Sequence, residues 1–213
     1  MNRPALVVVV LGTGTEVGKT WVSCRLLEQL RSAGVSVAAR KPAQSFDPPG
    51  SEDGATDADL LAHATGELAE AVCRSHRWYP KALAPPMAAD RLGRPPILLD
   101  DLVGELGWPR GVAVGLVETA GGVRSPIAHD GDGAALAHRL AADLAVLVAD
   151  AGLGTVHAVR ASAAALTPLP VVVLLNRYDD GDELHRANRD WLVQRDGLEV
   201  VTDVAAVVTC LTS

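Results

Sequence analysis

The chain has 213 residues, of which 48% are hydrophobic and 3% aromatic, and its formal net charge is −7. This length suits one α/β domain over residues 1–213, with a core made mainly of valine, leucine and alanine. The acidic balance and the lack of any run of lysines or arginines argue against nucleic acid as a partner, and no apolar stretch is long enough to span a membrane.

Three cysteines, Cys24, Cys73 and Cys210, lie far apart in the sequence and form no CxxC pair. The first apolar run is short and is followed at once by glycines, so it does not read as a secretory signal. Reduced thiols and a cytoplasmic location are therefore expected. The histidines are scattered and have no metal-ligand spacing.

A glycine-rich segment after the first apolar run is the most informative part of the chain. Residues 7–11 predict a buried strand, and the glycine loop 12–18 leads into a segment with helical spacing that begins near Lys19. Strand, glycine loop, Lys-Thr and helix are the arrangement of a phosphate-binding loop. Five residues separate Gly12 from Gly18, where the usual pattern has four.

The chemistry of such a loop predicts ATP and Mg²⁺ as cofactors. Backbone N–H groups and the helix N-terminus face the phosphates, while Lys19 reaches the β- and γ-phosphates and the Thr20 hydroxyl is available to Mg²⁺. The expected nucleotide contacts in the loop are Gly14, Thr15, Glu16, Val17, Gly18, Lys19 and Thr20.

The loop sequence GTGTEVGKT resembles the GTDTEVGKT loop of the dethiobiotin synthetase family, with Gly14 in place of an aspartate. Further blocks follow in the family's order over about the first 175 residues: Val22-Ser23-Cys24, Lys41-Pro42, Thr56-Asp57-Ala58, Glu118 with Ala120-Gly121-Gly122, and Gly152-Leu153-Gly154-Thr155. The resemblance implies a P-loop ATP-dependent ligase in which Thr15 and Glu16 line the loop towards the substrate and take part in catalysis.

Lys41 is the second candidate catalytic residue. A strand expected over 35–39 ends before Lys41-Pro42, which places the lysine at the carboxyl end of a parallel strand, where ligands bind in open sheets. The resemblance implies that Lys41 binds the substrate's carbamate and developing phosphate charge, and that Ser45 contacts substrate. Phe46 stands where the family has a glycine. An ordinary surface lysine is the alternative interpretation.

Residues 46–56 are rich in proline, glycine and acids and predict an exposed loop. A helix is expected to begin after Thr56, with Asp59 completing a capping box. Asp57 and Asp59 are both favoured in the first turn by the helix dipole, and this explanation suffices for Asp59. For Asp57 the family match indicates a contact with Mg²⁺.

A strand expected over 112–117 is followed by Glu118, a carboxylate placed to bind Mg²⁺ directly or through water. The resemblance implies that Gly121 contacts substrate. Thr119 replaces a family glycine whose missing side chain leaves room for substrate. Upstream, the proline-rich segment 83–86 resembles the part of the family that lines the substrate's aliphatic chain, and a simple connection is the alternative.

The turn Gly152–Thr155 precedes a helix and is a possible anion site. In the family this turn belongs to the dimer partner's half of the site, so the resemblance implies a homodimer in which Gly154 and Thr155 receive the substrate's carboxylate. His157 stands where the family usually has asparagine. A histidine on the helix surface is the alternative for that residue.

Asn176 follows the last clear strand, expected over 171–175, at the place where P-loop proteins contact the nucleotide base. Its amide can pair with the N6 and N7 edge of adenine. The sequence Asn176-Arg177-Tyr178-Asp179 is also close to the Asn-Lys-x-Asp pattern that reads guanine, and a polar turn is the third possibility. The family's glycine–proline loop and closing helix are not recognisable downstream, which predicts weak ATP binding with poor discrimination.

The remaining elements alternate in the manner of a mostly parallel sheet with helices on both faces. Helices are expected over 98–106, capped near Asp100, and over 133–142 and 155–165, with a short one around 184–192; strands are expected over 145–149 and 198–201.

The function expected is that of a dethiobiotin synthetase-like ligase acting on a diamine, CO2 and ATP. Two alternatives are a related ligase or kinase acting on another small substrate, favoured by Phe46, Thr119 and His157, and a partitioning-type switch ATPase. Proteins of the switch type carry an additional lysine early in the loop, where this chain has Gly12-Thr13-Gly14.

Overall fold

The structure is a computed structural model that describes residues 2–46 and 54–212. The strands are β1 (Leu6–Gly12), β2 (Val37–Arg40), β3 (Gln44–Ser45), β4 (Trp78–Tyr79), β5 (Val114–Gly122), β6 (Pro126–Ala128), β7 (Gly131–Asp132), β8 (Leu144–Asp150), β9 (Val171–Asn176) and β10 (Glu199–Val201). The helices are α1 (Lys19–Ser32), α2 (Asp57–Thr65), α3 (Ala69–Val72), α4 (Pro85–Arg91), α5 (Leu99–Glu105), α6 (Gly133–Arg139), α7 (Thr155–Leu166), α8 (Glu183–Gln194) and α9 (Val204–Thr212), with a short 3-10 helix at Ser75–Arg77.

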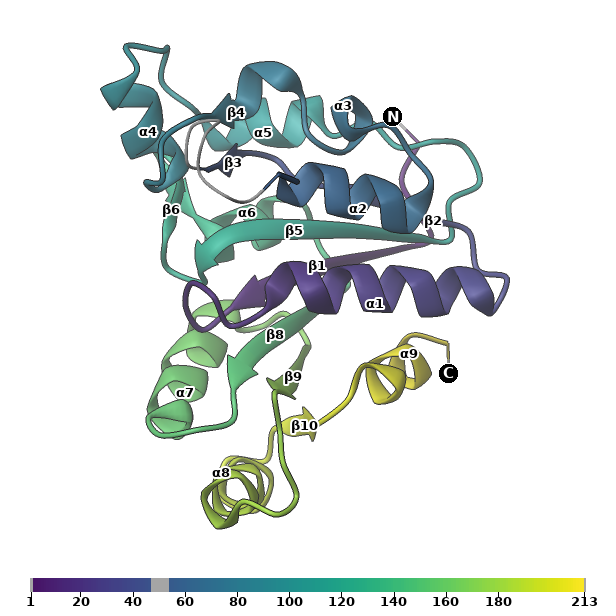
Figure 1. The fold of residues 1–213 in the computed structure, drawn as a ribbon, viewed down its shortest axis with the longest axis vertical. Coiled ribbons are helices and arrows are strands. Elements are labelled where there is room, and N and C mark those ends of the chain that lie inside the picture. The colour runs from purple at the N-terminus through teal and green to yellow at the C-terminus, as the bar shows by residue number, and fades with distance from the viewer. Residues whose placement is uncertain (1, 47–53, 213) are drawn as a thin grey trace.

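Within the described residues, six strands form one sheet in the order β10-β9-β8-β1-β5-β2, and every neighbouring pair is parallel. The first strand lies in the middle, so the loop that follows it opens at the centre of the carboxyl edge (Figure 1). This is where open parallel sheets bind their ligands.

Helices cover both faces of this sheet, since alternate residues of β1 belong to different cores. Val8 and Val10 pack with α1, α2 and α9, whereas Val7, Val9 and Leu11 pack with α6, α7 and α8. Figure 1 shows α1 and α2 on the near side of the sheet. Continuous apolar runs such as VVVV are therefore buried on both sides, and the predicted α/β class is confirmed.

A third, smaller core lies beyond the β2 edge of the sheet. It joins Tyr79 of β4 and Ala88 and Ala89 of α4 to Ile127 of β6 and Leu102 of α5. The segment that showed few periodic signals in the sequence is thus folded, and it forms a wall beside the carboxyl ends of β2 and β5.

Three sequence expectations are corrected. The strand expected over 112–117 continues to Gly122, because Glu118 still pairs with Val10, so Glu118 and Thr119 lie inside β5. Asp100 does not cap α5: Leu98 is the N-cap, Asp130 accepts the N–H of Leu99, and Asp100 pairs with Arg139.

A closing helix is also present, contrary to expectation. The apolar residues of α9 recur with helical spacing, and Val204 and Val207 are buried in the core that contains α1. The capping box of Thr56 and Asp59 at α2 is confirmed. Most of the loop expected over 46–56 lies outside the described residues. No helix in the described ranges is long and apolar enough to cross a membrane.

We predict that Leu27→Ala lowers the free energy of unfolding by about 2–5 kcal/mol, because it leaves a cavity between α1 and the sheet. Leu27 is fully buried, whereas Leu68 is 78% exposed. The matched variant Leu68→Ala is expected to change stability by about 0.5 kcal/mol or less. Urea unfolding measures both, and equal losses in the two variants would contradict this packing.

Candidate active site

A cavity of about 650 Å³ lies at the carboxyl edge of the sheet, between the glycine loop and the wall formed by the third core. It brings together side chains from segments that are far apart in the sequence. Those expected from the sequence are Thr15, Glu16, Gly18, Lys19, Thr20, Lys41, Ser45, Asp57 and Gly121. The apolar lining includes Leu83, Ala84 and Pro85.

The glycine loop owes its path to two positions without side chains. A Cβ at Gly12 would lie 2.8 Å from the Gly14 carbonyl oxygen, and one at Gly18 would lie 2.2 Å from Nδ2 of Asn176. Gly18 also has a φ of +93°, which only glycine adopts readily. Glu16, with a φ of 60°, accepts the left-handed region without being glycine. The loop is therefore tightly curled, and Lys19 Nζ folds back to donate to Gly14 O at 3.1 Å.

Four side chains form a charge cluster on the floor of the cavity: Thr20, Lys41, Asp57 and Glu118. Lys41 Nζ lies 2.6 Å from Asp57 Oδ2 and 2.7 Å from Glu118 Oε1. Thr20 Oγ1 lies 2.9 Å from both Asp57 Oδ1 and Glu118 Oε1, and these two oxygens share its single hydroxyl hydrogen. The structure thus brings together every residue that the sequence assigned to the metal, and the lysine expected at the strand end.

The sheet register explains this convergence. Val10 pairs with Glu118 and Arg40 pairs with Val117, so Lys41, directly after β2, lies beside Glu118. Glu118 points to the α1 side because side chains alternate along β5, where Leu116 also belongs to the α1 core. Thr20, in the first turn of α1, reaches the same point, and Asp57 arrives from the first turn of α2.

Burial and charge act against each other in this cluster. Burial alone would lower the pKa of Lys41, but the carboxylates of Glu118 and Asp57 outweigh it and raise the pKa. Burial likewise would raise the pKa of Asp57, and the Lys41 ammonium holds it below its usual value. For Lys19, burial and then repulsion from Lys41 lower the pKa, against the smaller opposing effect of Glu118 and Asp57. Lys19 and Lys41 both line the cavity, so it offers two ammonium groups to a polyphosphate ligand.

Glu118 is fully buried, and its second carboxylate oxygen, Oε2, has no hydrogen-bond partner among the described residues. Carboxylate and hydroxyl oxygens are the ligands that Mg²⁺ prefers, usually completed by water and phosphate oxygens. In the described part of the chain no three His, Cys, Asp or Glu side chains cluster as a metal site. The oxygens of Thr20, Asp57 and Glu118 are too few to surround a cation, but they fit one whose remaining ligands are water and phosphate oxygens.

The substrate side of the cavity has features that the sequence only suggested. Ser45 Oγ donates to the Leu83 carbonyl oxygen at 2.5 Å, which ties β3 to the apolar wall. A Cβ at Gly121 would lie 2.7 Å from Ser125 Oγ, and Gly121 has a φ of +68°. Ser45 and Gly121 therefore lie in the cavity beside its apolar lining.

Two departures from the family pattern, Thr119 and Phe46, are not part of the cavity lining. The Thr119 side chain is buried, and its hydroxyl donates to Val10 O at 3.4 Å, away from the cavity. Phe46 packs edge-on against Trp78, with ring centroids 6.4 Å apart. Neither side chain lines the cavity, although the Thr119 carbonyl oxygen accepts from Lys41 Nζ at 3.5 Å.

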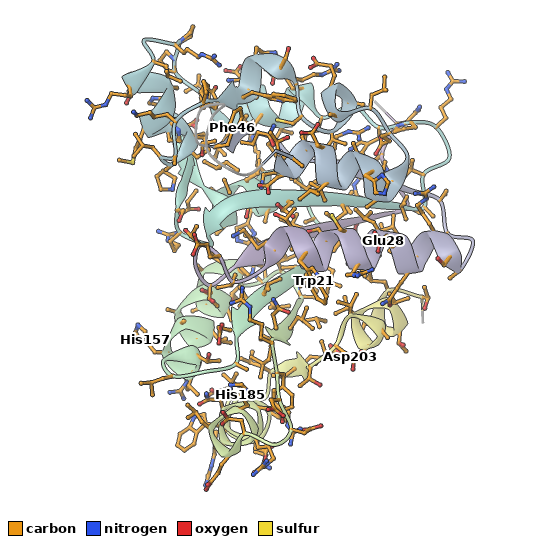
Figure 2. The ribbon with its side chains drawn as sticks, in the orientation of Figure 1. Trp21, Glu28, Phe46, His157, His185 and Asp203 are labelled. Atoms are coloured by element: carbon orange, nitrogen blue, oxygen red, sulfur yellow. The ribbon has the colours of Figure 1, made fainter. Side chains whose placement is uncertain are left out.

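The turn Gly152–Thr155 does not line this cavity. Thr155 donates its hydroxyl to Asp150 O at the start of α7, Leu153 is 93% exposed, and Gly154 has a φ of +89°. His157 is exposed on the outer side of α7 (Figure 2). The expected substrate contacts of Gly154 and Thr155 are thus not made within one chain.

Asn176 lines a second cavity, of about 930 Å³, between α1, the carboxyl end of β9 and the start of α9. Its Nδ2 donates to Val17 O at 2.9 Å, which fixes the glycine loop to β9. Asp179 does not line this cavity; its carboxylate accepts from the N–H of Gly181 at 2.8 Å. The Asp179 carboxylate thus takes part in a polar turn in this structure.

The residues of the site that the sequence did not predict include Trp21 and Arg177. The Arg177 guanidinium donates to Glu16 O at 3.0 Å and lies 3.2 Å from Asp150 Oδ2. Trp21 follows Thr20 and lines both cavities. The available signal for Trp21 was its position immediately after the Lys-Thr pair, and that for Arg177 was its place in the pattern Asn176-Arg177-Tyr178-Asp179.

The comparisons with known proteins agree with this geometry. The family model AAA_26, described as an AAA domain, matches residues 7–207. The ATP-dependent dethiobiotin synthetase of Rhodococcus jostii is 35% identical over 207 residues, which cover 94% of this chain and 86% of that protein. The chain belongs to the dethiobiotin synthetase family. The enzyme of Caulobacter vibrioides is 41% identical over 150 residues, covering 68% of this chain and 67% of that protein.

Several solved structures share the fold of this chain at lower sequence identity. The signal recognition particle receptor FtsY of Elizabethkingia anophelis matches with a TM-score of 0.55 and 15% identity, covering 100% of this chain and 67% of that one. A Borrelia burgdorferi protein described as a plasmid partition protein bound to AMPPNP matches with a TM-score of 0.55 and 13% identity, covering 94% and 88%. At these identities the likeness is one of P-loop fold alone.

We predict that Lys41→Met lowers the free energy of unfolding by about 3–5 kcal/mol, since it leaves the buried carboxylate of Glu118 without its cation. The double variant Lys41→Met with Glu118→Gln is expected to recover most of that loss. Lys81→Met changes an exposed lysine and serves as the matched control. Urea unfolding of the wild type, the two single variants Lys41→Met and Glu118→Gln, and the double variant gives the coupling energy, and a Lys41→Met variant as stable as the Lys81→Met control would contradict the charge balance.

Proposed function

We propose that the protein is an ATP-dependent ligase that converts 7,8-diaminononanoate, CO2 and ATP into dethiobiotin, ADP and phosphate, and that it works in the cytoplasm as a single domain over residues 1–213. One observation carries the proposal: a P-loop, two ammonium groups and the Asp57 carboxylate line one cavity that has an apolar wall, and the buried Glu118 carboxylate pairs with Lys41. Membership of the dethiobiotin synthetase family supports it.

In this reaction CO2 adds to one amine of the diamine and forms a carbamate. A carbamate oxygen then takes the γ-phosphoryl group of ATP, giving a carbamic–phosphoric anhydride. Attack by the second amine on the carbonyl carbon closes the cyclic urea and releases phosphate. Such transfer needs chiefly alignment and charge neutralisation, since charge spreads over the phosphoryl oxygens in the transition state.

The chain's own residues supply both requirements. Lys19 would hold the β- and γ-phosphates together with the N–H groups of the loop. Its ammonium group already lies over the loop, where it donates to Gly14 O. Lys41 would stabilise charge on the carbamate and the phosphoryl group in transfer. Thr15 and Glu16 lie on the cavity side of the loop, where they would position the reacting ends.

The substrate would lie along the apolar wall. Leu83, Ala84 and Pro85 face the cavity and suit an aliphatic chain, while Ser45 and Gly121 would contact the diamine end. Water would be excluded from the reacting atoms on this side.

Mg²⁺ is part of the proposal, held by Thr20, Asp57 and Glu118. When bound, it would neutralise phosphate charge. The Lys41 ammonium contacts the same two carboxylates in this structure, so a divalent cation and Lys41 compete for them. Lys41 would then be free to turn towards the carbamate.

The test of the function is product formation. The purified protein is incubated with 7,8-diaminononanoate, isotopically labelled bicarbonate and MgATP, and dethiobiotin is detected by mass spectrometry. We expect labelled dethiobiotin, with phosphate release that depends on both the diamine and bicarbonate. Phosphate release without the diamine, and no labelled product, would overturn the proposal and favour a switch ATPase.

We predict that Lys19→Ala and Lys41→Ala both abolish turnover but differ in nucleotide binding. Lys19 faces the nucleotide, so its loss is expected to weaken ATP as well as to slow the reaction. Lys41 is expected to act mainly on the chemical step, which shows as a lower kcat with nearly unchanged ATP affinity. Calorimetry and steady-state kinetics separate the two effects. Near-wild-type turnover of Lys41→Ala would refute the role given to Lys41.

We further propose a homodimer in which Gly154 and Thr155 of one copy receive the substrate's carboxylate in the other copy's site. The support is that this turn presents Leu153 to solvent and does not line its own chain's cavity. Sedimentation at micromolar concentration is expected to give a dimer, which Leu153→Asp weakens. A fully active monomer would contradict the shared site.

A further inference from the structure

Trp21 lies at the junction of the two cavities. Only three of the described residues, Gly18, Trp21 and Arg177, line both of them. Gly18 and Arg177 contribute to the glycine loop and its support, whereas the Trp21 side chain is 55% exposed on the first turn of α1. A ligand that binds Lys19 through its phosphates and extends into the second cavity therefore runs past these three residues, one of which is Trp21.

The second cavity has an apolar lining beside Trp21, together with several polar side chains. Its volume of about 930 Å³ is within the range of small-molecule sites, and Leu174, Val204 and Ala205 supply an apolar lining. Two of its polar groups are already committed: Asn176 Nδ2 donates to Val17 O, and Asp203 Oδ1 accepts from the Ala206 N–H. Figure 2 shows Trp21 on α1 and Asp203 at the start of α9, the two helices that flank this cavity.

The Trp21 ring has a cationic neighbour on its own helix. The Arg25 guanidinium lies 5.9 Å from the ring centroid and pairs with Glu28 at 3.0 Å. Such a guanidinium is attracted to one face of the ring. The indole is thus an exposed aromatic surface beside the glycine loop.

We propose that Trp21 is the stacking surface for the base of the nucleotide, and hence a binding residue of the site. This rests on the proposed use of ATP. Stacking on an aromatic ring is tolerant of base identity, because every base has a π-face. The affinity that Trp21 supplies is therefore expected to be similar for ATP and GTP and smaller for pyrimidine nucleotides, since their rings overlap the indole less.

The chain supplies a matched control for this proposal. Trp191 on α8 is 48% exposed, and the Arg195 guanidinium lies 5.9 Å from its ring centroid, but Trp191 lines neither cavity. Replacing it removes a tryptophan of similar exposure and similar cation–π contact, without touching the site.

The experiment measures binding of ATP, GTP, CTP and inorganic tripolyphosphate by calorimetry in the presence of Mg²⁺. Trp21→Ala is expected to weaken ATP by about 10- to 100-fold, the range of base–aromatic stacking, and Trp21→Phe to retain most of the affinity. Tripolyphosphate has no base, so its affinity is expected to be the same in wild type and Trp21→Ala, which also shows that the loop is folded. Trp191→Ala is expected to bind ATP as the wild type does.

Equal ATP affinity of Trp21→Ala and wild type would overturn the proposal and leave the proposed function standing. Equal loss of ATP and tripolyphosphate in Trp21→Ala would also overturn it, because the variant would then have damaged the phosphate site. A wild-type protein that binds tripolyphosphate but no nucleotide would overturn both this proposal and the use of ATP.

Discussion

A buried carboxylate that requires a cation is the constraint on which the rest of the site depends. Glu118 lies inside β5 with no exposed surface, and an unpaired charge at such a position is strongly unfavourable. Lys41 supplies the balancing charge at 2.7 Å, and Thr20 donates to the same oxygen. The cluster therefore ties the end of β2 and the first turn of α1 to the middle of the sheet, and these are the segments that carry the phosphate-binding residues.

The need of Glu118 for a cation also bears on the proposed reaction. Lys41 is held by carboxylates that also fit a divalent cation, so under the proposed function one cation can replace another without leaving Glu118 unpaired. Lys19 is close enough to Lys41 for their repulsion to lower its pKa, and it rests on a backbone carbonyl. Under the proposed function, both ammonium groups would exchange their present partners for phosphate or carbamate oxygens, which keeps the strongest interactions for the bound state.

The sequence could predict what local patterns encode: the buried β1, the glycine loop, the capping box at Thr56 and the convergence of strand-end side chains. It could not show that β5 continues through Thr119, because that extension depends on pairing with β1 rather than on propensity. Nor could it show where the Thr119 hydroxyl points or that Arg177 reaches Glu16, since both contacts join residues more than a hundred positions apart. The helix α9 was encoded by its apolar spacing, although no closing helix was expected from the sequence.

The most direct test of the central claim is the affinity of the nucleotide-free protein for Mn²⁺, a spectroscopic substitute for Mg²⁺, measured by electron paramagnetic resonance. If Lys41 occupies the carboxylates that would ligate the metal, Lys41→Met is expected to bind Mn²⁺ about tenfold or more tightly than wild type, because no ammonium competes. Adding Glu118→Gln is expected to remove that gain. Equal or weaker Mn²⁺ binding by Lys41→Met would contradict the account that one cation replaces another at Glu118.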